Sequence, residues 1–177
     1  MILTVREFWT AFHGIVLGAV FLLAFSGVLL ELYGLRPRWI TPEGMARSLR
    51  RSKIGTALMA GIAWLTVITG TYIAYPWYRA KPPEGTTDLM DFPRYYLLSV
   101  PNLSVWHSFG MEWKEHIAWF APILATAVAF VVWKSGAQLV ENSKLRKGVL
   151  ILFSLAFVAA AIAGLFGAFI TKAAPVM

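Results

Sequence analysis

The sequence contains no cysteine. Disulfide bonds, iron–sulfur clusters and the covalent attachment of c-type haem all require cysteine thiols, so this chain forms none of them. A redox metal or haem would therefore depend on histidine or methionine ligands, and the chain has only three histidines and six methionines. The range of possible redox chemistry is narrow.

Charged residues are also few, at 14% of the chain, whereas 58% of the 177 residues are apolar. This content is too hydrophobic for a soluble core of this size. The formal net charge of +7 does not indicate nucleic-acid binding, because most basic residues lie in short segments between apolar runs, where they orient a membrane protein. We predict one membrane domain, residues 1–177, whose main partner is the lipid bilayer.

Four apolar runs are long enough, at about 20 residues each, to cross a bilayer. They lie near residues 8–32, 54–75, 116–133 and 148–170. Helices satisfy their own backbone hydrogen bonds at membrane depth, so the sequence predicts an all-α, four-helix integral membrane bundle. The first run is too long for a signal peptide and lacks a clear small-residue cleavage site, so we expect it to remain in the mature protein.

Basic residues follow the first and third runs and mark the cytoplasmic side by the positive-inside rule. They are Arg36, Arg38, Arg47, Arg50, Arg51, Lys53, Lys134, Lys144, Arg146 and Lys147. The segment 76–115 is rich in proline and has more acidic than basic residues, so we predict an irregular outer cap with a short helix near residues 104–114. Both termini are then outside a bacterial inner membrane.

The two halves of the chain share an order of features. Each half has a histidine at the outer end of a descending helix, then a basic loop, then a glycine near the outer end of an ascending helix. The pairs are His13 with Gly70, and His116 with Gly167. This pattern suggests a two-hairpin internal repeat about an axis along the membrane normal, although any two apolar hairpins share much of it.

Two histidines at matched depth suggest the two axial ligands of a b-type haem. His13 and His116 begin helices that run in the same direction, and a six-coordinate haem iron takes one imidazole on each face. Small residues at the same depth would let a macrocycle approach the helices, or would serve ordinary helix packing. These candidates for the pocket wall are Gly14, Gly70, Gly164 and Gly167. Alternatively, both histidines are interfacial and bind no metal.

His107 precedes His116 by nine residues, about two and a half helical turns, which would place the two on opposite faces of a continuous helix. Met111 would share the face of His107, and these two residues are the alternate ligands. His107 could instead contact a partner. Basic residues near the outer face would pair with haem propionates. The main candidates are Arg79 and Arg94, and the further candidates are Arg6, Lys81 and Lys114.

With histidines opening the first and third helices, glycines ending the second and fourth, and short basic inner loops, the chain resembles small four-helix b-type cytochrome subunits of bacterial membranes. It is also similar to an uncharacterised bacterial four-helix family with the same histidine placement. The resemblance covers the helical parts, and the segment 76–115 departs from it in length and in having His107. It implies non-covalent haem b and electron transfer between quinol or quinone and a periplasmic partner.

Three functions are therefore open. The first is a haem b electron-transfer or anchor subunit of a respiratory or photosynthetic complex, and quinone is a possible second cofactor. The second is a cofactor-free structural subunit held by other subunits. The third is a copper or zinc protein that uses His13, His107 and His116. Because the sequence has no nucleophile–base set or phosphate loop, we do not expect it to be a catalyst on its own.

Overall fold

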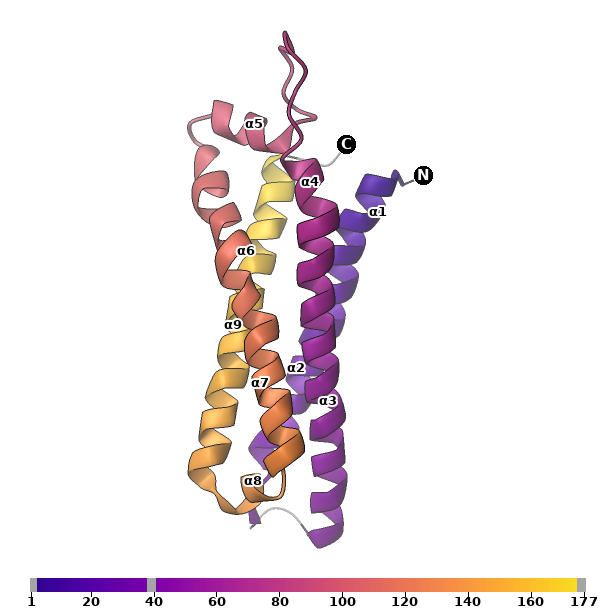
Figure 1. Cartoon of the computed structure of the whole chain (residues 1–177), viewed down its shortest axis with the longest axis vertical. Helices are drawn as coiled ribbons and strands as arrows, with labels where there is room; N and C mark the ends of the chain where they lie inside the picture. Colours follow the sequence, from indigo (N-terminus) through magenta and orange to yellow (C-terminus); the bar gives the residue numbers. More distant parts are fainter. Residues whose placement is uncertain (1–2, 38–40, 175–177) are drawn as a thin grey trace. The chain divides into compact units, whose positions relative to one another are not determined.

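The computed structural model describes residues 3–37 and 41–174, so Arg38 and the extreme ends of the chain lie outside the described residues. Four helical stretches are long and apolar enough to cross a membrane, and Figure 1 traces them by colour along the chain. They are Val5–Gly34, Pro42–Tyr78, Trp106–Ser135 and Ser143–Ala173. Each contains one of the four predicted runs, and the described residues include no strand. The all-α multi-pass membrane fold is confirmed.

The first stretch begins at a capping box. The Thr4 hydroxyl accepts a hydrogen bond from the backbone N–H of Glu7, and the Glu7 carboxylate accepts one from the backbone N–H of Thr4. These two bonds satisfy amides that a helix start leaves unpaired. The stretch then runs through α1 (Val5–Ala11), the π-helical turn η1 (Phe12–Val16) and α2 (Leu17–Gly34).

The second stretch continues past the proline at which the sequence predicted the outer cap to begin. It consists of α3 (Pro42–Thr69), the π-helical turn η3 (Gly70–Ala74) and α4 (Tyr75–Tyr78). Pro76 lies in the first turn of α4, directly after the π-helical turn. Proline is tolerated there because a missing N–H costs least at the beginning of a helix. The helical stretch therefore continues past Pro76 to Tyr78.

The third stretch begins earlier than predicted, at Trp106. It joins the π-helical turn η4 (Trp106–Met111), α6 (Glu112–His116), the 3₁₀ turn η5 (Ile117–Trp119) and α7 (Phe120–Ser135). The short helix predicted near residues 104–114 is thus continuous with the third span. Between Tyr78 and Trp106 lies a connection that contains α5 (Pro93–Ser99) and a turn at Gly85, whose φ of 83° suits glycine. The outer cap is correspondingly shorter than residues 76–115.

The last stretch follows a short helix, α8 (Gln138–Glu141), and is a single uninterrupted helix, α9 (Ser143–Ala173). The Asn142 side chain accepts a hydrogen bond from the backbone N–H of Leu145 and so caps the start of α9. Arg146 donates to the carbonyl oxygens of Leu139 and Val140 in α8, which closes the turn between the two helices.

The chain divides into two compact units, and every long stretch contributes to both. Unit 1 holds the described residues up to Gly18, then Leu65–Trp119, and those from Ala161 onward; unit 2 holds Ala19–Trp64 and Phe120–Ala160. Unit 2 has an extensive apolar core. Its most completely buried side chains include Leu32, Met59, Val128, Val132, Leu139 and Phe153. Unit 1 has a smaller core, formed by Tyr78, Leu97, Met111, Ile170 and Ala174.

Candidate cofactor site

All three histidines lie in unit 1, together with every other residue that the sequence analysis assigned to the haem pocket. Unit 1 therefore contains His13, His107, His116, Met111, Gly14, Gly70, Gly164, Gly167, Arg79 and Arg94. Unit 2 contains none of them. The structure gathers the predicted site residues within one compact part of the fold, and their individual contacts show how they are arranged there.

His13 lies in the π-helical turn η1 and is half-buried. Its Nδ1 is 3.1 Å from the Thr69 hydroxyl, at the end of α3. That hydroxyl also lies 2.8 Å from the Leu65 carbonyl; when it donates its proton there, it accepts from the imidazole and Nδ1 carries the ring proton. In the neutral ring Nε2 then has the free lone pair, which is the form of histidine that binds a metal.

Gly70, the first residue of η3, makes room for the His13 ring. A Cβ atom built at Gly70 would lie 2.8 Å from Cε1 and 3.4 Å from Nε2 of His13. Real Cβ atoms do not approach other atoms as closely as the shorter of these distances, so the ring could not keep this position beside alanine. The glycine predicted to admit a macrocycle is therefore in direct contact with the imidazole.

Lys114 and Gly167 form a similar contact between α6 and α9. The Lys114 ammonium donates to the Ala163 carbonyl at 3.3 Å, and a Cβ atom at Gly167 would lie 3.0 Å from Nζ. Lys114 is also within electrostatic range of His13. From its position in the sequence, Lys114 is expected to be a surface cation that could pair with a propionate, whereas in the structure its amine contacts the backbone of α9.

His107 has a tyrosine partner that the sequence did not predict. Its Nδ1 is 2.7 Å from the Tyr78 hydroxyl, and the two ring centroids are 5.9 Å apart. Tyr78 and Met111 are both buried in the core of unit 1. His107 and Met111 both belong to η4, so the relative direction of their side chains follows from a π-helical turn and not from the spacing of an ordinary α-helix.

His116 is more exposed than the other two histidines, with 68% of its side chain accessible. Its Nδ1 is 3.0 Å from the backbone carbonyl of Glu112 and 3.4 Å from the Glu112 carboxylate. Both partners lie on its own helix, α6, whereas the partners of His13 lie on α3 and η3. The structure holds each ring in place through Nδ1, and it does so by separate contacts.

The two arginines predicted to meet propionates lie beside Tyr78 and His107. Arg79 donates to the Tyr75 hydroxyl at 2.9 Å. Arg94 is within electrostatic range of both Tyr78 and His107, and its guanidinium carbon is 5.9 Å from the centre of the Tyr95 ring. Its Nε is buried and has no hydrogen-bond acceptor among the described residues. A buried donor of this kind is suited to a carboxylate that the protein itself does not supply.

Gly14 and Gly164 differ from the other two glycines, because a Cβ atom at either position would meet open space. The four predicted wall residues therefore form two pairs, one in close contact with a polar side chain and one without such a contact. Among the described residues, no group of three or more His, Asp or Glu side chains is placed to hold a metal ion. The structure thus does not gather His13, His107 and His116 into a copper or zinc centre.

The π-helical turns are the feature of the site that the sequence analysis missed. His13 lies in η1, His107 lies in η4, and Gly70 begins η3, so the close contact between His13 and Gly70 joins two such turns. A π-helical turn is rare and is often found at functional sites, where it redirects side chains. Hydrophobic periodicity gives no signal for it, because one extra residue per turn does not change how apolar the segment is.

No family model, curated protein or solved structure matches this chain.

Proposed function

We propose that this protein is a haem b-binding electron-transfer or anchor subunit of a bacterial inner-membrane complex, with both termini on the periplasmic side. The observation that carries the proposal is the placement of His13. It is a half-buried imidazole within a membrane span and in a π-helical turn, and its Nδ1 forms a hydrogen bond with the Thr69 hydroxyl. Ionisable side chains within spans are costly and usually functional.

His13 is the first axial ligand in this proposal, through Nε2. Histidines that bind metals commonly donate the other ring N–H to an oxygen, which orients the ring and makes it a better ligand. Thr69 has this role for His13, and the Glu112 carbonyl and Tyr78 hydroxyl provide equivalent partners for His116 and His107. His116 is the second ligand by sequence position, and His107 is its alternate.

The other polar groups of unit 1 suit the periphery of a haem. The buried Nε of Arg94 would donate to a propionate, and Arg79 would add positive charge at the same place. When bound, haem b supplies one-electron transfer between ferrous and ferric iron, with quinol or quinone as one possible partner. Four candidate spans, an even number, support a topology with both termini on one side, and the basic loops favour the periplasmic side.

The test is the visible spectrum of the detergent-purified protein, recorded as reduced-minus-oxidised and pyridine haemochrome spectra. We expect a b-type spectrum that is lost in His13→Ala and kept in Tyr72→Ala, a matched change at a side chain that is 71% exposed. Comparing His116→Ala with His107→Ala identifies the second ligand. In His13→Gly, added imidazole should restore the spectrum, which separates loss of a ligand from loss of the fold.

Other outcomes would support other functions. A b-type spectrum that survives in His13→Ala contradicts the ligand assignment. Copper or zinc at one ion per chain, without haem, favours the metal-binding alternative. A stable colourless protein, recovered only with partner subunits, favours the cofactor-free structural subunit.

A further inference from the structure

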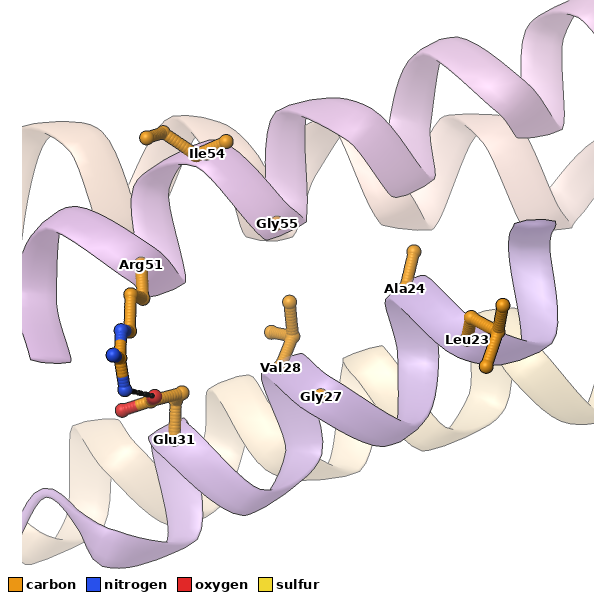
Figure 2. Close-up of a pocket in the computed structure, with 8 residues that line it drawn as sticks. All are labelled: Leu23, Ala24, Gly27, Val28, Glu31, Arg51, Ile54 and Gly55. Carbon is orange, nitrogen blue, oxygen red and sulfur yellow. Dashed lines mark hydrogen bonds and ion pairs between the residues drawn. The ribbon is translucent and has the colours of Figure 1, made fainter.

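A separate feature of the molecule lies in unit 2, between α2 and α3. A hollow of about 310 Å³ opens there, and its lining is mostly apolar. Figure 2 shows the residues that line it: Leu23, Ala24, Gly27, Val28 and Glu31 from α2, and Arg51, Ile54 and Gly55 from α3. None of these residues belongs to the proposed haem site.

The hollow has one polar end. There Arg51 Nη1 lies 3.3 Å from the Glu31 carboxylate, an ion pair that Figure 2 marks with a dashed line, and the Ser48 hydroxyl donates to the other carboxylate oxygen. The lining extends from Glu31 to Leu23 along α2, a length of about 12 Å at the rise of an α-helix. The hollow therefore combines a charged end with an apolar groove.

The apolar part is continuous with surface that faces the bilayer. Leu23 and Ile54, on the two sides of the hollow, are 73% and 56% exposed. Side chains of this kind within a membrane span contact lipid acyl chains, because no other apolar solvent surrounds them. An acyl chain could thus enter the hollow from the side without leaving hydrocarbon.

The charge at the polar end favours an anion. Arg47, Arg50 and Arg51 lie close together near the start of α3, so three guanidinium groups stand against the two carboxylates of Glu31 and Glu43. Arg51 keeps 65% of its side chain exposed while it is paired, so its remaining N–H donors face outward. Basic residues between membrane helices at the level of the headgroups attract anionic lipids.

We infer that this hollow binds one anionic phospholipid, with an acyl chain along α2 between Leu23 and Val28 and the phosphate at Arg51 and Arg47. A quinone fits the same residues less well. A quinone is neutral, so the net positive charge of this end attracts it less than it attracts a phosphate, and the Ser48 hydroxyl already donates to Glu31. The site does not depend on haem and would be present in either form of the protein.

Two glycines allow a matched test of the groove. A Cβ atom at Gly27, in the lining, would meet open space, and the same is true of Gly61, which lies on α3 outside the lining. The Cβ of Gly27→Leu therefore meets no neighbour and its side chain should occupy the groove, while Gly61→Leu adds the same side chain elsewhere. Thermal melting of both variants confirms that each still folds.

The measurement is native mass spectrometry of the purified full chain, titrated separately with phosphatidylglycerol, phosphatidylcholine and a ubiquinone. We expect one phosphatidylglycerol per chain, retained in Gly61→Leu and lost in Gly27→Leu. Arg51→Gln should weaken this binding about fivefold, the effect of removing one cation near an anionic headgroup. Lys147→Gln, an equal charge change at an exposed position of α9, should leave it unchanged.

Three results would refute the inference. Equal affinity for phosphatidylcholine would show that charge does not select the lipid. Displacement of phosphatidylglycerol by ubiquinone at equal concentration would assign the hollow to a quinone. Equal binding by Gly27→Leu and Gly61→Leu would place the bound lipid elsewhere on the protein.

Discussion

The two units of this protein differ in how their helices are built. In unit 2, α2, α3, α7 and α9 run without interruption around a core of Leu, Val, Met and Phe side chains. In unit 1, the described chain has three π-helical turns, a 3₁₀ turn and the three histidines. Regular helices pack densely, whereas irregular turns place polar side chains where function needs them. Unit 2 thus has the larger apolar core, and unit 1 has the proposed ligands.

The two hairpins also invite comparison, because each places a glycine of an ascending helix against a polar side chain of a descending one. In the first hairpin Gly70 accommodates His13, and in the second Gly167 accommodates Lys114. The sequence paired Gly167 with His116, which is two residues further on. The internal repeat stays a prediction, and these two contacts are the positions at which it could be examined.

The largest expected effect comes from the core of unit 2. Phe153 is fully buried, and its ring stacks on Phe25 with centroids 5.0 Å apart. Phe153→Ala should lower the free energy of unfolding by about 3–5 kcal/mol, through lost contacts and a cavity. Phe130→Ala, at a ring that is 62% exposed, is the control and should change it by less than about 0.5 kcal/mol. Unfolding in mixed micelles of increasing SDS content measures both.

Equal losses in these two variants would mean that the core of unit 2 does not dominate stability. The comparison between the units would then fail, because the regular helices would not be the stable part of the protein.

A second effect tests how closely α2 and α3 approach. A Cβ atom at Gly55 would overlap Cγ2 of the buried Val28, so Gly55→Ala should destabilise by about 1–3 kcal/mol through overpacking. The added Val28→Ala substitution should recover part of this loss, because it removes the methyl group that clashes. Gly61→Ala, where a Cβ meets open space, should cause no loss. Thermal melting of the parent protein, Gly55→Ala, Val28→Ala and the double variant forms a double-mutant cycle, and additive effects would exclude the contact.

A third effect concerns the polar contacts of unit 1. Tyr78→Phe removes the hydroxyl that lies 2.7 Å from His107 Nδ1, and leaves a partly buried imidazole nitrogen without that partner. The expected cost is about 1–2 kcal/mol. Tyr72→Phe, at an exposed ring of the same helical stretch, should be neutral. If the two variants melt at the same temperature, the hydrogen bond contributes nothing to stability.

The smallest effects separate the predicted pocket glycines. Gly70→Ala should displace the His13 ring and lower stability by about 1 kcal/mol, because a Cβ atom 2.8 Å from Cε1 forces the ring to shift. Gly14→Ala should be neutral or raise stability by up to about 1 kcal/mol, since alanine favours helix and its Cβ meets open space. NMR of the imidazole resonances would detect the displaced ring. Unchanged resonances in Gly70→Ala would show that the contact is not needed.

The sequence predicted the spans well and the contacts of the site poorly. Every predicted apolar run lies within an observed helical stretch, and every predicted ligand lies in unit 1. The partners Thr69 and Tyr78 were not predicted. They come from residues 56 and 29 positions away from their histidines, and no local pattern relates residues at such separations. The predicted boundaries differ at Pro76 and Trp106 because the first turn of α4 tolerates a proline and because η4 extends the third span.

The sequence by itself determined that the chain is helical and belongs in a membrane, because the hydrocarbon core accepts only long apolar segments with satisfied backbones. It also excluded cysteine as a metal ligand, because the chain has none. The tertiary structure alone decided that His13 meets Gly70, that Lys114 rests on α9, and that a hollow opens beside Gly27. Helices that are apolar on all sides do not reveal which face is turned inward, so these contacts depend on helix rotation and packing.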